Sequence, residues 1–189
     1  GILRLIFRVR AQGREHIPAR TPCILVANHQ SYIDGLFVSM FLNNAFLRRT
    51  FYYAKRKHVK KGLLEWLARN SNVIVVEVGR DVQLSLQMMA QAIRQGGNLL
   101  IFPEGTRSED GQLGDFKGTF AALALELKVP VIPVAISGAI RALPRGRRIP
   151  RFLTRVTVRF LPPIPIEADT TESTLADAAR DAIARHLIQ

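Results

Sequence analysis

Cysteine is almost absent from this chain of 189 residues, which contains only Cys23. A single cysteine cannot form an intramolecular disulfide, and it leaves no cysteine set for a zinc site. Cys23 lies in the apolar run Pro22–Ala27, which predicts a buried structural thiol rather than a nucleophile. The composition permits a reducing compartment and excludes a disulfide-stabilised scaffold.

Long hydrophobic runs are also missing. No stretch reaches the roughly 18 uninterrupted apolar residues of a membrane-spanning helix, and the apolar segment Val129–Ile140 is too short and contains prolines. The chain begins at Gly1 rather than Met, so we expect a processed form or an excised domain. An anchoring segment upstream of Gly1 is compatible with this expectation. Repeats and low-complexity segments are absent as well. Length and composition, with 48% hydrophobic and 22% charged residues, predict one folded domain over residues 1–189.

Acidic residues are scarce, since 15 Asp and Glu face 27 Lys and Arg, and the net charge is +12. Two stretches without any acid, 48–61 and 141–159, hold much of the excess. Such clusters attract a polyanion, either nucleic acid or an anionic membrane, where each basic residue contributes about 1 kcal/mol. A merely solvated basic surface is the alternative. The clustered residues are Arg48, Arg49, Lys55, Arg56, Lys57, Lys60 and Lys61, and Arg141, Arg145, Arg147, Arg148, Arg151, Arg155 and Arg159.

Apolar and β-branched runs alternate with helical periodicity along the chain. This alternation predicts a single α/β domain with a mixed, largely parallel sheet flanked by helices. The wholly apolar strand 23–27 suits a sheet covered on both faces, and Pro133 predicts an edge strand or a bulge. We expect strands over 3–11, 23–27, 50–54, 73–78, 98–102, 131–137 and 156–161, and helices over 32–42, 62–69, 82–94, 119–127 and 175–187.

The first candidate site, 28–34, follows a buried strand, where ligands bind in open α/β sheets. If His29 lies in the loop and Asp34 in the first helical turn, the carboxylate can reach back to the imidazole. A carboxylate on one ring nitrogen makes the other a general base. A solvated loop histidine is the alternative. Ser31 would serve as a helix N-cap rather than as a nucleophile.

The second candidate, Phe102–Ser108, also follows a strand. Gly105 allows backbone amides to approach a ligand closely, and Arg107 offers a planar fork of donors for phosphate. A surface turn with a stray arginine is the alternative. Arg80 and Lys55 follow strands in the same way, and each either binds phosphate or faces solvent.

Taken in this order, the segments resemble the glycerolipid acyltransferase family, the lysophosphatidate acyltransferases and their relatives. The first family block, Asn-His followed by four residues and Asp, matches Asn28, His29 and Asp34. The third matches at every position of Phe102–Ser108, and the fourth, an apolar strand with a proline, matches 129–134. Arg80 matches the end of the second block, and Lys55 a basic position between the first two.

The resemblance implies that His29, oriented by Asp34, deprotonates the acceptor hydroxyl, which attacks an acyl thioester without a covalent acyl-enzyme. It also implies that Lys55, Arg80, Glu104, Gly105, Thr106 and Arg107 bind the substrate. No metal or other cofactor is implied, and the donor is acyl-CoA or acyl carrier protein. The implied acceptor is 1-acylglycerol 3-phosphate, with glycerol 3-phosphate, another lysophospholipid or an amino-acid lipid as alternatives.

The partners expected are these substrates and an anionic membrane surface, with acyl carrier protein as a further candidate and no nucleic acid. We expect a cytoplasmic protein, peripheral on the inner face of the membrane, whose apolar residues near the first basic cluster insert shallowly. A non-catalytic nucleic-acid-binding module is the competing class, but no helix-turn-helix, zinc pattern or interleaved aromatics support it. The residues expected to insert are Phe51, Tyr52, Leu63, Leu64 and Trp66.

Overall fold

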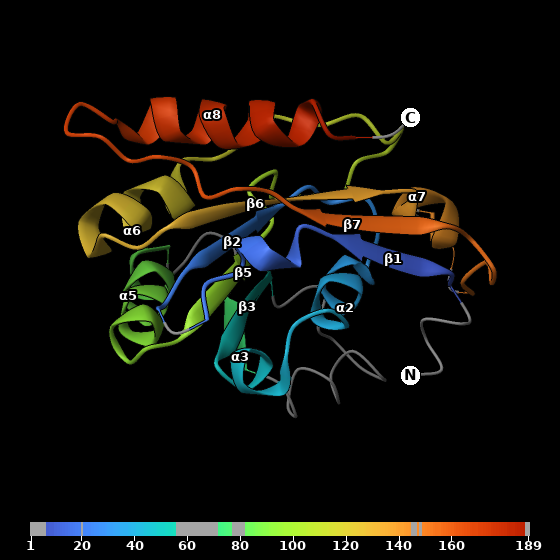
Figure 1. Cartoon of the computed structure of the whole chain (residues 1–189), viewed down its shortest axis with the longest axis horizontal. Helices are drawn as coiled ribbons and strands as arrows, with labels where there is room; N and C mark the ends of the chain where they lie inside the picture. Colours follow the sequence, from blue (N-terminus) through green and yellow to red (C-terminus); the bar gives the residue numbers. More distant parts are fainter. Residues whose placement is uncertain are drawn as a thin grey trace.

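The computed structural model describes residues 7–19, 21–55, 72–76, 82–144, 147 and 149–187 (Figure 1). In this part of the chain the strands form one seven-stranded sheet of order β1-β7-β6-β2-β5-β3-β4. All neighbouring strands are parallel except β6 and β7. The strands are β1 (Val9–Gln12), β2 (Ile24–Ala27), β3 (Thr50–Lys55), β4 (Val73–Val76), β5 (Asn98–Ile101), β6 (Val131–Ser137) and β7 (Val156–Phe160).

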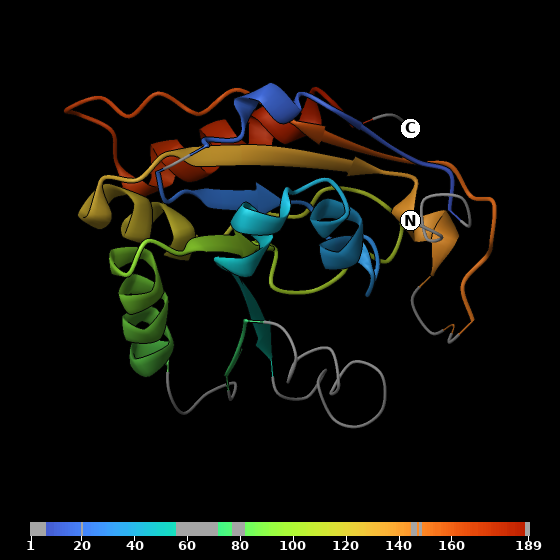
Figure 2. The same ribbon diagram turned by 60° about the horizontal axis from the view of Figure 1, so that its bottom comes forward.

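The helices cover both faces of this sheet, which confirms the predicted mixed α/β architecture. α5, α6 and α8 lie on one face, whereas α2 and α3 lie on the other (Figures 1 and 2). The helices are η1 (Arg14–His16), α2 (Asp34–Ser39), α3 (Asn44–Arg48), α5 (Val82–Arg94), α6 (Thr119–Leu127), α7 (Ala139–Ala142) and α8 (Glu172–Ala184).

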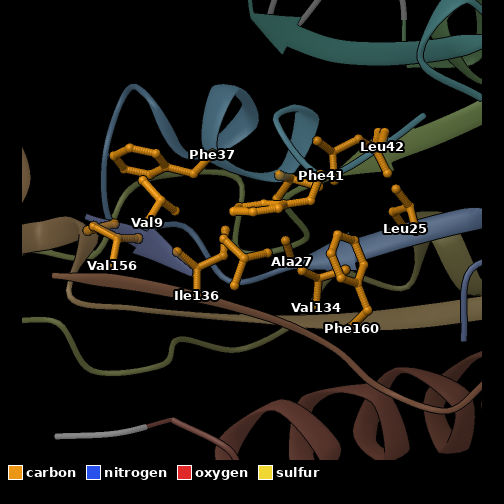
Figure 3. Close-up of a cluster of buried hydrophobic side chains, with 14 of the residues drawn as sticks. Val9, Leu25, Ala27, Phe37, Phe41, Leu42, Val134, Ile136, Val156 and Phe160 are labelled. Atoms are coloured by element: carbon orange, nitrogen blue, oxygen red, sulfur yellow. The ribbon is translucent and has the colours of Figure 1, made fainter. Parts of the chain in front are cut away.

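Strand β2 lies in the middle of the sheet and is completely buried. Its side chains alternate between two hydrophobic clusters: Leu25 and Ala27 pack with Phe37 and Phe41 from the α2 side, and Val26 packs on the opposite face. Figure 3 shows the first of these clusters. The prediction of a strand covered on both faces is therefore confirmed, and Cys23 just before it is buried too. Burial raises the pKa of the Cys23 thiol to about 12.

The prediction that Pro133 marks an edge or a bulge is wrong, because β6 lies between β7 and β2. The antiparallel ladder with β7 begins at the pair Val134 and Phe160, one residue beyond Pro133. The Pro133 carbonyl accepts a hydrogen bond from the Leu161 N–H, on the side facing the end of β7. In a strand, the N–H and C=O of one residue point to the same side, so the N–H that Pro133 lacks would also face β7. The ladder with β7 stops there, so no ladder hydrogen bond is lost and an interior strand tolerates the proline.

Two predicted boundaries near the first candidate site also differ. The described part of the strand predicted over 3–11 is β1, which begins at Val9, because Phe7 and Arg8 form a turn in which Arg8 has φ 41°. Residues 3–6 lie outside the described residues. The helix predicted over 32–42 spans Asp34–Ser39, and the next helix begins after Asn43, whose side chain accepts a hydrogen bond from the Phe46 N–H. Asn43, which directly follows the predicted helix, therefore starts another helix.

The outer boundaries of the other predicted elements shift by a few residues, and the helix predicted over 62–69 lies outside the described residues. Helix α8 begins at Glu172, earlier than predicted, because Thr171 and Thr174 form a reciprocal capping box. The short helices η1, α3 and α7 had no periodic pattern long enough to predict them.

Gly138, between β6 and α7, has φ 84°, and a Cβ there would lie 2.3 Å from the Arg155 carbonyl oxygen. We expect Gly138→Ala to lower the free energy of unfolding by roughly 2–5 kcal/mol, because backbone strain and overpacking add. Gly96 is the matched control, since it has φ 83° with no atom within 4 Å of its added Cβ. Gly96→Ala should cost only about 1–2 kcal/mol. Urea denaturation of both variants measures the difference, and equal losses would contradict the close contact at Gly138.

Candidate active site

The candidate site begins where the chain leaves β2. The Asn28 side chain donates a hydrogen bond to the Ile136 carbonyl (2.9 Å) and accepts one from the Ile136 N–H (2.7 Å). This amide extends the β2–β6 pairing by one residue beyond the end of β2. It fixes where the chain turns out of the sheet, and so where His29 begins. The sequence assigned Asn28 to a motif but no structural role; a buried asparagine directly after an apolar strand was the available signal.

His29 and Asp34 meet as the loop-and-helix arrangement predicts. Asp34 is the first residue of α2, and its Oδ2 lies 2.9 Å from His29 Nδ1. The same oxygen accepts hydrogen bonds from the Gln30 and Ser31 N–H groups, both at 2.7 Å. Three donors on one carboxylate oxygen therefore lock the first turn of α2 onto the loop that carries the imidazole.

The electrostatics of this pair favour one histidine tautomer. The Asp34 side chain is fully buried, whereas 21% of the His29 side chain is exposed. Burial raises the pKa of the Asp34 carboxyl, and the hydrogen bond and charge of His29 and the two N–H donors oppose that rise. A carboxylate that accepts from Nδ1–H leaves the lone pair on Nε2, the nitrogen able to meet a substrate.

The Phe102–Ser108 segment lies against His29, although 75 positions separate His29 from Glu104. Glu104 Oε1 accepts a hydrogen bond from the His29 N–H (2.7 Å), and Glu104 Oε2 accepts one from the Gly114 N–H (3.0 Å). The Ser108 N–H donates to the His29 carbonyl (2.8 Å). The Phe102 ring stacks on the imidazole with centroids 4.3 Å apart. This segment therefore holds both the peptide and the ring of His29.

Burial raises the pKa of the Glu104 carboxyl, and the N–H groups of Gly114 and His29 work against that rise. Both of its oxygens have protein partners, so the structure shows Glu104 as a support for His29. The binding of substrate by Glu104, Gly105 and Thr106 stays a prediction. Gly105 has φ 69°, and its N–H donates to the Phe102 carbonyl, which closes the turn predicted for this segment. Thr106 is exposed.

Arg107, which the sequence predicted to bind phosphate, is largely buried rather than freely exposed. Only 9% of the residue is exposed, and its guanidinium carbon lies 3.3 Å from the centroid of the Tyr32 ring. A cation over an aromatic face is attracted by the ring electrons. Tyr32 itself is 38% exposed. No role for Tyr32 was predicted from the sequence, and nothing in its spacing indicated the contact.

The expected N-cap role of Ser31 is wrong in detail. The N-cap position of α2 is Ile33, and Ser31 Oγ accepts a weak hydrogen bond from the Ile33 N–H at 3.4 Å. Ser31 is fully buried, which keeps its hydroxyl away from a substrate. Asp34 takes over the N-terminal anchoring because its carboxylate reaches the Gln30 and Ser31 N–H groups.

The parallel arrangement brings the candidate segments to one edge of the sheet. β2, β3, β4 and β5 run in the same direction, so their carboxyl ends share that edge. Lys55 is the last residue of β3 and lies there, although its side chain is outside the described residues. Arg80 is also outside them. Among the described residues, no three His, Cys, Asp or Glu side chains gather as a metal site would require.

Comparison with known proteins identifies the family. The family model described as Acyltransferase matches residues 8–137, which include both candidate segments. The chain belongs to the Acyltransferase family. The predicted resemblance to lysophosphatidate acyltransferases is thereby confirmed at the level of the family.

Curated relatives and a solved structure in this family are similar over nearly the whole chain. The chain is 28% identical to 1-acyl-sn-glycerol-3-phosphate acyltransferase BAT2 of Brassica napus, covering 96% of this chain and 51% of that protein. It is 32% identical to a Chlamydomonas reinhardtii enzyme of the same activity name, covering 96% and 53%. For the alpha enzyme of Mus musculus, the identity is 31% and the coverage 93% and 62%. The chain thus spans about half to three-fifths of these relatives.

The crystal structure of the 1-acyl-sn-glycerophosphate acyltransferase PlsC from Thermotoga maritima shares the fold. The TM-score is 0.75 at 30% sequence identity, covering 94% of this chain and 69% of that one. No helix among the described residues is long and apolar enough to cross a bilayer.

Proposed function

We propose that this chain transfers a fatty acyl group from acyl-CoA or acyl carrier protein to the free hydroxyl of 1-acylglycerol 3-phosphate, giving phosphatidic acid. The observation that carries the proposal is the 2.9 Å contact between His29 Nδ1 and the buried Asp34 carboxylate, at the carboxyl end of a central strand. The relatives named as 1-acyl-sn-glycerol-3-phosphate acyltransferases support the choice of acceptor.

In the proposed reaction, His29 Nε2 removes the proton of the acceptor hydroxyl as its oxygen attacks the thioester carbonyl. The resulting imidazolium is stabilised by Asp34. The tetrahedral intermediate then collapses with cleavage of the carbon–sulfur bond, and the proton on His29 passes to the leaving sulfur. The product ester and the free thiol leave, and His29 returns to its starting state. Ser31, the hydroxyl nearest to His29 in the sequence, is buried, so the proposed reaction has no covalent acyl-enzyme intermediate on it.

The donor, the acceptor and the membrane location are parts of the same proposal. The acceptor carries one acyl chain and the product carries two, so both reside in a membrane. An excess of basic residues favours an anionic surface and an acidic donor, and both acyl-CoA and acyl carrier protein are acidic. Work at the inner face of the membrane follows from this proposal.

The experiment that tests the function incubates the protein with a panel of acceptors and both donors, and identifies the products by mass. The panel contains 1-acylglycerol 3-phosphate, glycerol 3-phosphate, other lysophospholipids and an amino-acid lipid. Phosphatidic acid as the dominant product supports the proposal. A higher kcat/KM for another acceptor reassigns the substrate, and no acyl transfer to any acceptor refutes the activity.

Arg107→Ala should weaken use of the phosphorylated acceptor by about 10- to 100-fold in kcat/KM, the range expected for loss of a hydrogen bond to a charged group. The donor KM should change little. Arg107→Lys should not restore the loss, because an ammonium lacks the planar fork of donors and stacks less well on Tyr32. Separate titrations of acceptor and donor measure these effects.

Monoacylglycerol, which has no phosphate, provides the control for this prediction. If Arg107→Ala lowers turnover of monoacylglycerol as much as that of lysophosphatidate, Arg107 supports the loop rather than the phosphate. Tyr32→Phe keeps the aromatic face that Arg107 contacts, so any effect of this variant reports on the hydroxyl rather than on that contact.

A further inference from the structure

The connection between α7 and β7 exposes three large apolar side chains. Ile149 is 75% exposed, Phe152 62% and Leu153 60%, the highest values among the large hydrophobic residues that the structure describes. By contrast, Phe51 and Tyr52, which the sequence analysis expected to insert into a membrane, pack against the two core clusters. Tyr52 also shares a hydrogen bond with Ser39. Among the described residues, the most exposed apolar side chains therefore lie in this connection and not at Phe51 and Tyr52. The other residues expected to insert, Leu63, Leu64 and Trp66, are outside the described residues.

The exposed apolar residues belong to an ordered turn. The Arg151 N–H donates to the Ala142 carbonyl (2.7 Å), and Thr154 Oγ1 donates to the Arg151 carbonyl (2.9 Å). Phe152 contacts Phe7 with ring centroids 6.1 Å apart. Leu153 has φ 60°, an uncommon conformation for a residue with a side chain. These contacts hold the turn in a shape that directs apolar groups outward.

Arginines flank these apolar side chains in the sequence. Arg141, Arg147, Arg151 and Arg155 are all exposed. No aspartate or glutamate occurs anywhere between residues 127 and 166. Apolar side chains that enter the acyl region, ringed by cations that meet phosphate, are the combination that binds anionic membrane interfaces. An acidic protein partner is the alternative, and the vesicle experiments below distinguish the two.

The turn lies at the same edge of the sheet as His29. β6 is parallel to β2 and antiparallel to β7, so the connection from β6 to β7 leaves the sheet at the edge where β2 ends. Figures 1 and 2 show this connection beside α7, at the end of the molecule toward which β2 and β6 point. A surface docked through the turn would therefore face the edge that carries the candidate site.

We infer that the 149–153 turn and its flanking arginines form an anchor that inserts into an anionic bilayer and presents the His29 edge of the sheet to the lipid. The benefit for catalysis rests on the proposed function, because it assumes an acceptor that resides in the bilayer. The insertion itself does not, and it can be measured without any turnover.

Insertion is tested with a fluorescent label at Leu153→Cys, using an environment-sensitive dye such as NBD. The native Cys23 is buried with a raised pKa, so the introduced thiol reacts selectively. The control label is at Asp169→Cys, an exposed position in the connection between β7 and α8, at the opposite edge. On adding phosphatidylglycerol vesicles, the label at position 153 should shift to the blue and be quenched by brominated lipid tails, whereas the label at 169 should not. The same response at both positions, or none at 153, overturns the inference.

Two pairs of variants measure the apolar and electrostatic contributions by vesicle flotation. Phe152→Ser with Leu153→Ser should weaken binding on the order of tenfold, whereas Leu84→Ser with Met88→Ser, which removes two exposed apolar side chains from α5, should not.

Arg147→Glu with Arg151→Glu should weaken binding to a similar or greater extent and flatten its salt dependence. Arg14→Glu with Arg185→Glu alters net charge equally at exposed positions outside the turn, and is the control. Equal losses in turn variants and controls, or equal binding to neutral and anionic vesicles, overturn the anchor.

Activity then separates the anchor from the function. With a short-chain lysophosphatidate that stays dissolved, the turn variants should keep the rate of the unmutated protein. With acceptor embedded in vesicles they should lose activity in proportion to binding. Loss on both forms of acceptor would place the turn in the site and contradict an anchoring role. If no variant and no unmutated protein turns over either acceptor, the proposed function fails, and the labelling and flotation results still decide the anchor. A chain that self-associates through the turn, with vesicle binding unchanged in the turn variants, would show a second copy as the occupant.

Discussion

His29→Ala should lower kcat by about 10²- to 10⁴-fold, the usual contribution of a positioned general base, while the KM values change little. Alanine leaves no group near Asp34 to accept the hydroxyl proton. The rate is measured as thiol release from acyl-CoA with a chromogenic thiol reagent. Cys23 contributes little background in the folded protein, because it is fully buried and its pKa is raised to about 12.

Two controls separate a chemical role from a structural one. His186→Ala removes a histidine whose Nδ1 contacts the Ala182 carbonyl at the end of α8, far along the chain from the site, and should leave the rate unchanged. Added imidazole should restore part of the activity of His29→Ala, because the small base can occupy the space that the ring has left. Near-normal turnover in a folded His29→Ala protein would refute the proposed mechanism.

Asp34→Asn should lower kcat by a comparable factor of about 10²–10⁴, because the carboxylate that stabilises the imidazolium is lost. The amide oxygen can take the place of Oδ2, which accepts from the Gln30 and Ser31 N–H groups and lies 2.9 Å from His29 Nδ1, so the contact with His29 is kept. The negative charge beside the imidazole is lost, however, because an amide is neutral. A neutral partner no longer stabilises the imidazolium that forms when Nε2 takes the proton of the acceptor hydroxyl, so Nε2 becomes a weaker base.

The expected loss should come without unfolding. Asparagine has nearly the shape of aspartate, and it removes a charge whose burial already raises the pKa of the carboxyl. Thermal melting should therefore stay close to that of the unmutated protein while kcat falls. Asp110→Asn is the matched control, because Asp110 is an exposed aspartate in the connection after β5 and should not affect the rate. Full activity in Asp34→Asn would leave His29 without the orienting partner proposed here.

The bounds of helices and strands predicted from local sequence pattern agreed best with the structure for the long elements in the middle of the chain. α5, α6 and β6 have the predicted bounds, because each is long enough for its apolar spacing to be unambiguous. Short elements were missed or shifted, because side-chain hydrogen bonds rather than periodicity decide where they begin. Asn43 at α3 and Asp34 at α2 are two such cases.

By itself, the sequence determined the buried central strand, the mixed α/β class, the family, and the His29–Asp34 pair, whose partners are only five positions apart. Only the tertiary structure decided that Glu104 and Phe102 support His29, that Arg107 lies under Tyr32, and that Phe152 and Leu153 rather than Phe51 and Tyr52 face outward. The physical reason is one of range. Local spacing sets the period of an element and the reach of near neighbours, whereas the order β6-β2-β5 depends on which apolar faces pack against each other. That packing brings segments 75 residues apart into contact and decides which apolar side chains remain exposed.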